Sequence, residues 1–258
     1  MRYATSLLLG TVLTLCAGVP AMSADDPAYR EHERIAKSFS LDPGSRIEIS
    51  TIPGPVVINT TSGRSADVEV VRAAATRADL DCGGVLIEQS GSTLTIRSVD
   101  KCTIVRGSQT VTLRVPRDVD LSLRNIAGRV RIGSTDGMVY LESIAGRVEA
   151  AGLREARMSS LAEGLELAVF DLGERGIRVS SVRGGIDLNV NSRIDAEVVT
   201  RSVEGRIDNE VPGVRITEDD GQNQRALLGS GRGKIQIESV VGTVKIRGWR
   251  QVAAVTRR

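Results

Sequence analysis

The sequence predicts an all-β protein, a flattened β-solenoid whose strand–corner–strand coils repeat every 18–21 residues or so. Three observations predict this fold class. Aromatic residues make up only 2% of the 258 residues, so the core must be packed from Val, Ile and Leu, which favour strands. Glycine is abundant, at 27 residues. Short segments with a period of two recur along the chain, and each is interrupted at the same point.

The repeat places two alternating apolar residues before a small polar residue, which is followed at once by another apolar residue and then by a glycine. The period of two breaks at the small polar residue, so the chain must bend there, and we expect the glycine to supply an unusual dihedral. The glycines are Gly54, Gly128, Gly146, Gly184, Gly205 and Gly242. The small polar residues are Thr51, Asn125, Ser143, Ser181, Ser202 and Ser239, with Ser160 in a weaker copy.

These small polar residues are expected to align in one row and to hydrogen-bond along it. The alternative architecture is an antiparallel sandwich in which the motif is a recurrent strand–turn. The two readings differ in how the copies pair, because a solenoid stacks them in parallel.

The first 23 residues have the order of a secretory signal peptide: a basic residue, an apolar run from Ser6 to Leu15, and small residues up to a cleavage point after Ser23. The alternative is a lipoprotein signal with lipid on Cys16, although Leu15 stands where such signals carry a small residue. The apolar run is too short to span a bilayer comfortably, and no later run approaches that length. The mature chain is therefore expected to be periplasmic or secreted and not membrane-spanning.

The remaining chain divides by pattern. Residues 24–38 are expected to be a linker or a short polar helix, and residues 39–248 a single β-solenoid domain. Within it, 39–120 reads as an N-terminal hairpin region and 121–248 as regular coils, with 208–234 an irregular insertion. Residues 249–258 are expected to be a C-terminal cap or tail.

Removing the signal peptide leaves two cysteines, Cys82 and Cys102. An even pair in an oxidising compartment predicts a disulfide, which would close a loop of about 20 residues and stabilise the fold by about 3 kcal/mol. A redox pair is the alternative, but the spacing is not Cys-x-x-Cys.

Composition excludes several function classes. The single histidine, His32, rules out a multi-histidine metal site and disfavours a histidine-based triad. A net charge of +2 gives no long-range field of the kind that nucleic-acid binders use. No catalytic residue, metal site or cofactor is therefore expected.

Arginine outnumbers lysine 30 to 4, and three corner glycines are followed by it, at Arg129, Arg147 and Arg206. Guanidinium groups bind phosphate and carboxylate bidentately, so these arginines are possible anion-binding residues. The alternative is a mixed-charge, solvated surface in which nearby glutamates neutralise them.

Residues Leu123–Val130 and Ile237–Val244 resemble the β-strand repeats of a bacterial putative-adhesin family, a domain of unknown function with toastrack-like β-solenoids. The departure is the long gap between Gly205 and Gly242. The resemblance implies a non-catalytic, adhesin-like binding module of the cell envelope, with a glycan, a lipid or a protein as partner. Because family members also occur in envelope-stress and signalling contexts, a sensor or scaffold acting through a protein partner is the alternative. A polysaccharide-processing β-helix enzyme is a remote one, since the coils are short and aromatic residues are few.

Overall fold

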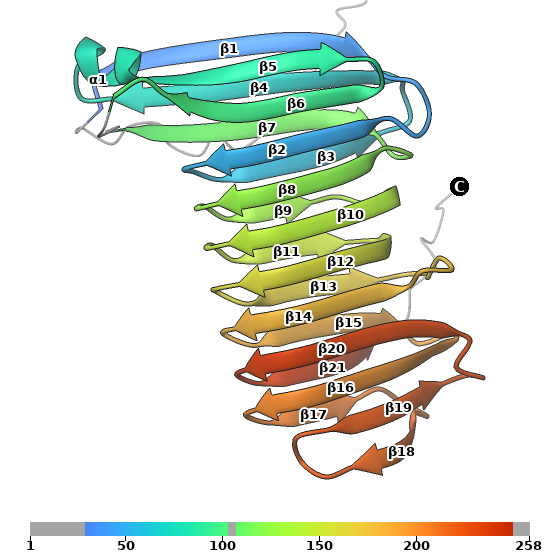
Figure 1. The fold of residues 1–258 in the computed structure, drawn as a ribbon. Helices are drawn as coiled ribbons and strands as arrows, with labels where there is room; N and C mark the ends of the chain where they lie inside the picture. Colours follow the sequence, from blue (N-terminus) through green and yellow to red (C-terminus); the bar gives the residue numbers. More distant parts are fainter. Residues whose placement is uncertain (1–28, 103–106, 250–258) are drawn as a thin grey trace, which may run out of the picture.

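The computed structural model describes residues 29–102 and 107–249. The expected signal peptide and residues 250–258 of the expected tail lie outside these residues. The described chain is all-β apart from one short helix, α1 (Arg77–Cys82), and forms two large mixed sheets that face each other (Figure 1). Val, Ile and Leu side chains fill the space between the sheets in one continuous core.

Ten strands form one sheet and eleven form the other. In spatial order, the ten-stranded sheet contains β1 (Glu31–Ser40), β4 (Ser65–Ala74), β7 (Ser108–Pro116), β3 (Val56–Thr61), β9 (Val130–Ile132), β11 (Val148–Ala151), β13 (Leu165–Val169), β15 (Ile186–Asn191), β21 (Val244–Trp249) and β17 (Ile207–Glu210). The 11-stranded sheet contains β18 (Arg215–Asp219), β19 (Gln224–Leu228), β16 (Ala196–Glu204), β20 (Gly233–Val241), β14 (Ile177–Arg183), β12 (Leu153–Leu161), β10 (Thr135–Ile144), β8 (Asp120–Ile126), β2 (Arg46–Ile52), β6 (Thr93–Asp100) and β5 (Gly83–Ser90).

Each copy of the repeat gives one strand to the 11-stranded sheet and the next strand to the ten-stranded sheet. Neighbouring copies pair in parallel with their motifs in register; Leu141 lies between Leu123 and Met158, for example. These apolar positions are buried because they face the opposite sheet. The predicted strand, corner and strand are therefore present.

The corner itself differs from the expectation. The bend lies at the small polar residue, as expected, but the unusual dihedral is there as well: all seven small polar residues have a left-handed backbone, with φ between 53° and 58°. This conformation lets two successive residues, such as Glu142 and Ser143, both face outward before Ile144 turns back into the core. The seven side chains are exposed, and no hydrogen bond joins them to one another among the described residues.

The corner glycines serve close stacking. Gly54, Gly128 and Gly146 lack a positive φ, but a Cβ on Gly146 would lie 2.5 Å from the carbonyl carbon of Gly128. Gly184, Gly205 and Gly242 combine similar crowding with a positive φ, of 94°, 156° and 138°. The expected dihedral role therefore holds only for the second group.

The order of the coils in space differs from their order in sequence. The last repeat, β20 and β21, lies between β14/β15 and β16/β17, and the first repeat, β2 and β3, lies between β6/β7 and β8/β9. A terminal repeat placed inside the stack has both of its edges paired, which avoids an open edge. Residues 208–234, expected to be irregular, contain the end of β17 and the antiparallel pair β18 and β19, which continues the 11-stranded sheet to its edge.

The expectation of a linker or short helix over residues 24–38 is wrong where the structure describes them. Residues 31–40 form β1, which pairs antiparallel with β4. Ile35 and Phe39 are partly buried against the core, while charged side chains occupy half of the other positions. Such a pattern is typical of an edge strand, whose charges keep it from pairing with other chains.

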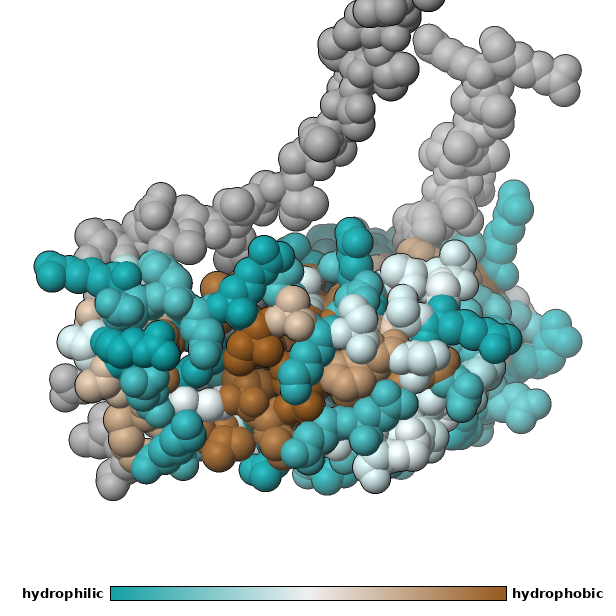
Figure 2. All heavy atoms as spheres, turned by 90° about the horizontal axis from the view of Figure 1, so that it is seen from above, coloured by the Kyte–Doolittle hydropathy of each residue, from teal (hydrophilic) through white to brown (hydrophobic). Residues whose placement is uncertain are grey.

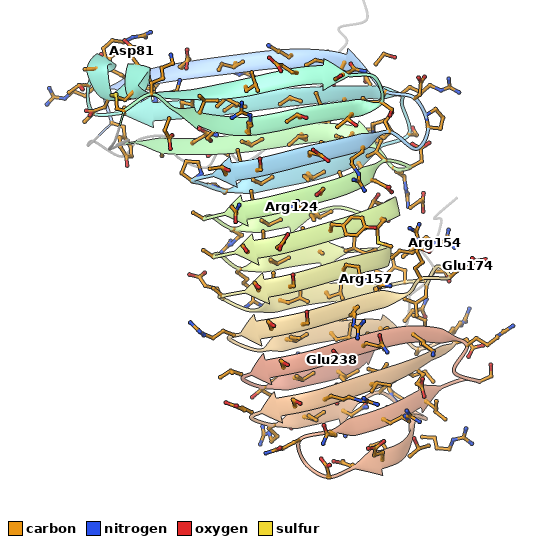
Figure 3. All side chains as sticks on the ribbon, viewed as in Figure 1. Asp81, Arg124, Arg154, Arg157, Glu174 and Glu238 are labelled. Atoms are coloured by element: carbon orange, nitrogen blue, oxygen red, sulfur yellow. A yellow bond between two sulfur atoms is a disulfide. The ribbon has the colours of Figure 1, made fainter. Side chains whose placement is uncertain are left out.

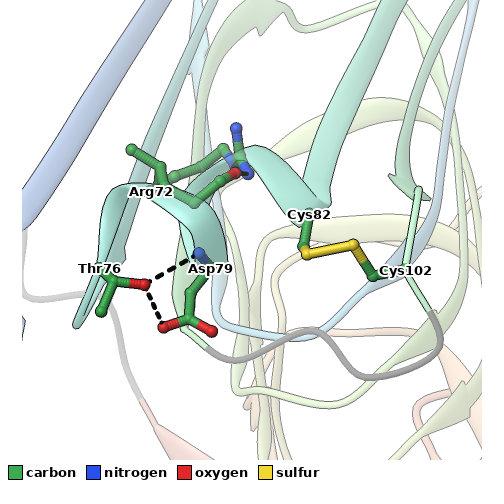
Figure 4. Close-up of a disulfide and its surroundings, with 6 residues drawn as sticks. Arg72, Thr76, Asp79, Cys82 and Cys102 are labelled. Carbon is green, nitrogen blue, oxygen red and sulfur yellow. Dashed lines mark hydrogen bonds between the residues drawn. A yellow bond between two sulfur atoms is a disulfide. The ribbon is translucent and has the colours of Figure 1, made fainter.

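The predicted N-terminal hairpin region carries the expected disulfide, between Cys82 and Cys102, whose Cα atoms are 5.2 Å apart (Figure 4). Helix α1 ends at Cys82 and begins after Thr76, whose hydroxyl accepts a hydrogen bond from the Asp79 amide. Arg72 of β4 is only 8% exposed; it donates to the Leu80 carbonyl and pairs with Glu33 of β1. These contacts fasten α1 and β1 to the sheets.

Figure 2 shows the molecule from the end at which β1 and β5 lie, looking along the stacked strands. Apolar side chains lie in the middle of this view, with hydrophilic side chains around them (Figure 2). The outer faces of both sheets therefore present polar and charged residues, and a ligand that binds a flat face meets those side chains.

Candidate functional site

The arginines singled out from the sequence lie on the ten-stranded sheet. Arg129 and Arg147 precede β9 and β11, and the amide of Val130 donates to the Arg147 carbonyl at 3.0 Å. Arg206 precedes β17, which is separated from β11 by β13, β15 and β21. The structure thus brings the first two together and leaves the third apart.

Each of these arginines has a carboxylate partner. Arg129 lies 3.6 Å from Glu149, and Arg206 lies 2.7 Å from Asp208. Arg147 reaches two carboxylates, those of the next two strands of the sheet, at 3.4 and 3.5 Å. The arrangement matches the alternative reading, a mixed-charge surface, because the guanidinium groups are already neutralised.

The outer face of the 11-stranded sheet carries a more distinctive feature, an open hollow of about 320 Å³ over β8, β10, β12 and β14. Its floor comes from a register row in which Ser159 and Ser180 are neighbours. Longer side chains flank them in the same row, Glu142 on one side and Glu238 on the other. Two short side chains between two long ones leave the surface recessed.

The neighbouring row supplies one wall. Tyr140, Arg157 and Arg178 lie side by side in register on β10, β12 and β14. The Tyr140 ring is half-buried, and the Arg46 guanidinium lies 5.7 Å from its centroid, within cation–π range. Arg46 therefore lies over one face of the ring.

Charge balance singles out one residue of the hollow. Arg124 pairs with Glu142 at 3.4 Å, and Arg178 pairs with Glu238 at 3.3 Å. Arg157 has no carboxylate partner among the described residues; its Nη1 donates to the carbonyls of Ala156 and Arg175 at 3.2 and 3.3 Å. Figure 3 labels Arg124, Arg157 and Glu238 along the front, 11-stranded sheet. Arg157 is therefore a positioned guanidinium with an uncompensated charge.

Sequence reasoning missed this hollow because its residues meet only through strand register. A signal was nevertheless present. The tetrapeptides Arg157–Ser160 and Arg178–Ser181 share the pattern Arg-x-Ser-Ser at equivalent places in successive repeats. Since the side chains of equivalent positions stack on neighbouring strands, the pattern predicts paired arginines beside paired serines.

The described residues contain no cluster of metal-binding side chains at the hollow. Among residues 29–102 and 107–249, no group of three or more His, Cys, Asp or Glu side chains could hold a metal ion. His32 is exposed on β1. Asp220, in an acidic loop, accepts hydrogen bonds from the Asn223 side chain and from the Asn223 and Gln222 backbone amides, which lower its pKa and close a turn.

A second charged cluster is structural. Hydrogen bonds from the Arg232 and Ser230 side chains hold the pKa of the Asp195 carboxyl well below its usual range. Arg232 Nε lies 2.6 Å and Ser230 Oγ 2.8 Å from one carboxylate oxygen, and the Gly231 amide lies 2.6 Å from the other. Asp195 thereby fastens the turn that leads into β20, the strand inserted between β14 and β16.

Comparison with known proteins gives structural likenesses only. No family model and no curated protein matches the sequence. A putative cell adhesion protein from Clostridium sporogenes is similar over 84% of this chain and 100% of its own, at 10% identity and a TM-score of 0.47. A putative adhesin from Bacteroides fragilis is similar over 83% and 97%, at 16% identity and a TM-score of 0.37.

A putative lipid binding protein from Parabacteroides distasonis is similar over 84% of this chain and 97% of its own, at 12% identity and a TM-score of 0.28. With TM-scores below 0.5, the likenesses assign neither ligand nor activity to this chain. The one described helix, α1, is six residues long, and no described segment is a helix able to cross a membrane.

Proposed function

We propose that the protein is a non-catalytic, adhesin-like binding module that works outside the cytoplasm and binds its partner across the outer face of the 11-stranded sheet. The observation that carries the proposal is the hollow on that face, where Arg157 presents a positioned and uncompensated charge. Arginines elsewhere on the repeats are mostly neutralised by carboxylates, so this face differs from its surroundings.

We infer further that the body is a flattened β-solenoid. The parallel pairing of successive copies, their alternation between two facing sheets and the left-handed corner at each copy support this architecture. A stacked body of this kind holds equivalent side chains in straight rows, which suits a repetitive or extended partner such as an envelope polymer.

Location outside the cytoplasm is supported by the tripartite N-terminus and by the disulfide, which persists in oxidising compartments. Intact-mass measurement of the exported protein tests it. We expect the mass of a chain cleaved near Ser23. A mass that retains Met1 would contradict export through this signal. A lipid on Cys16 would show that the protein is anchored to a membrane and not released.

Binding to the isolated cell-envelope fraction tests the proposed face. Ser159→Glu fills the floor of the hollow and adds a negative charge beside Arg157, so we expect it to abolish binding. Asn189→Glu adds the same charge at a half-buried outward position of β15, in the other sheet, and serves as the matched control. Binding that survives Ser159→Glu, or that is lost equally in both variants, would contradict the assignment of the face.

A further inference from the structure

We propose that the hollow binds a carboxylate-bearing sugar unit, a uronic acid of an acidic glycan, with its carboxylate on Arg157 and its ring against Tyr140. This inference rests on the proposed function and specifies the ligand class of the same face. Of the three arginines that line this recess, Arg157 alone has no carboxylate partner among the described residues, and two serine hydroxyls and an aromatic ring line the same recess.

The charge of the hollow fits a singly charged ligand. Three arginines line it, and two of them already pair with Glu142 and Glu238. The remaining positive charge matches one carboxylate. A doubly charged phosphate monoester would meet the same guanidinium but would also be repelled by the two glutamates.

Arg157 is prepared to bind a planar anion. Two carbonyls hold its Nη1, which fixes the side chain and leaves Nε and Nη2 as donors. Two parallel N–H donors match the two oxygens of a carboxylate, and a guanidinium fixed in advance loses less side-chain entropy on binding.

The other lining residues favour a sugar over a simple carboxylate. Ser159 and Ser180 are half-buried, and neither hydroxyl has a hydrogen-bond partner among the described residues, so both are free to donate to and accept from sugar hydroxyls. Tyr140 lines the hollow, and the face of its ring that Arg46 does not cover is offered to the apolar C–H face of a sugar ring. A volume of about 320 Å³ is at the small end of ligand pockets and suits a short segment of a polymer.

The test is calorimetric titration of the mature protein with trisaccharides of galacturonate, glucuronate, mannuronate and guluronate, and with the methyl ester of each. We expect at least one acidic trisaccharide to bind and its methyl ester to bind at least ten-fold more weakly. Added salt should lower the affinity for the acidic trisaccharide. Arg157→Gln should lower the affinity for the acidic trisaccharide at least ten-fold, because the substitution removes the charge and the bidentate donors.

Arg201→Gln is the matched control. Arg201 is exposed on the same outer face, on β16, and has no carboxylate partner among the described residues, yet it lies outside the hollow. We expect less than a two-fold change there. Tyr140→Phe should keep binding, because the ring remains, and Tyr140→Ala should lose it. Thermal unfolding of each variant verifies that it is folded.

Three results would overturn the ligand class: equal binding of acid and ester, equal weakening by Arg157→Gln and Arg201→Gln, or no binding of any uronate. The envelope assay above separates these failures from failure of the proposed function. If the envelope fraction binds the protein and Ser159→Glu abolishes it while the uronates do not bind, only the ligand class is wrong. If neither assay shows binding, both proposals fail.

Discussion

The corner glycines give the sharpest test of how the repeats stack. In Gly146→Ala the new Cβ would lie 2.5 Å from the carbonyl carbon of Gly128 and 2.6 Å from the amide nitrogen of Arg129. Both atoms belong to the backbone of the neighbouring strand connection, so no side-chain rotation relieves the contact. The two corners must move apart, by about 1 Å, to reach an ordinary carbon–carbon separation.

Two backbone hydrogen bonds beside this contact oppose the movement. The Ala145 amide donates to the Ile126 carbonyl at 2.8 Å, and the Val130 amide donates to the Arg147 carbonyl at 3.0 Å. Weakening both costs about 2 kcal/mol, and the overpacking itself costs about 1–3 kcal/mol. We therefore expect the free energy of unfolding to fall by about 3–5 kcal/mol, a decrease in Tm of roughly 6–20 °C for a domain of this size.

Gly133→Ala is the matched control. Gly133 follows β9 in the same sheet, its φ is not positive, and the nearest atom to a new Cβ is the Ile58 carbonyl oxygen at 3.4 Å, an ordinary contact. We expect the free energy of unfolding to change by no more than about 1 kcal/mol, because alanine also lowers the entropy of the unfolded chain and so offsets part of any loss. Thermal and urea unfolding of both variants measure the difference. Equal shifts in Tm, or an unchanged Gly146→Ala, would refute the close-stacking role of this glycine.

Three further predictions concern the corners, the turn before β20 and the disulfide. Thr51 is the one β-branched residue among the seven left-handed corners, so Thr51→Asn should raise the free energy of unfolding by about 1 kcal/mol in urea; a loss would show that the threonine side chain stabilises its corner. The folded-state pKa of Asp195 is lowered, so its stabilisation is complete above the unfolded value of about 3.9 and is lost as pH falls below it. The stability difference between the wild type and Asp195→Asn should therefore shrink between pH 6 and pH 2, and a difference independent of pH would contradict this role. Unfolded, unreduced protein should label no thiol at Cys82 or Cys102, and reduction should lower stability by about 3 kcal/mol; two free thiols would exclude the cross-link.

The sequence alone determined the repeat, the strand pairs within it and the place of each corner. These features are local: the period of two comes from side chains that alternate between core and solvent, and a break in that period requires a bend wherever the chain folds. The seven small polar residues could therefore be identified as corner positions from the sequence. Their left-handed backbone could not, since a glycine nearby was the better candidate for it. The cysteine pair was likewise predictable, because only two cysteines follow the expected signal peptide.

Other features depended on the tertiary structure. The sequence order of the repeats suggests that the last copy ends the stack, whereas β20 and β21 lie inside it, because equivalent repeats fit equally well beside several neighbours and only the whole assembly selects among them. The strand at residues 31–40 is polar enough to read as a linker, and its pairing with β4 defines it.

The charges illustrate the same division. The sequence identifies Arg147 as a possible ligand for an anion and does not single out Arg157, although both occur in repeats. Register then places Arg147 near two carboxylates of the neighbouring strands, Glu166 and Asp187, and places Arg157 between Tyr140 and Arg178. Whether an arginine has a carboxylate partner depends on residues one or two strands away in the sheet. These residues are distant along the chain, so no local sequence pattern predicts the pairing. Residue types and their period therefore decided the strands and corners, and strand register alone decided which guanidinium remained free.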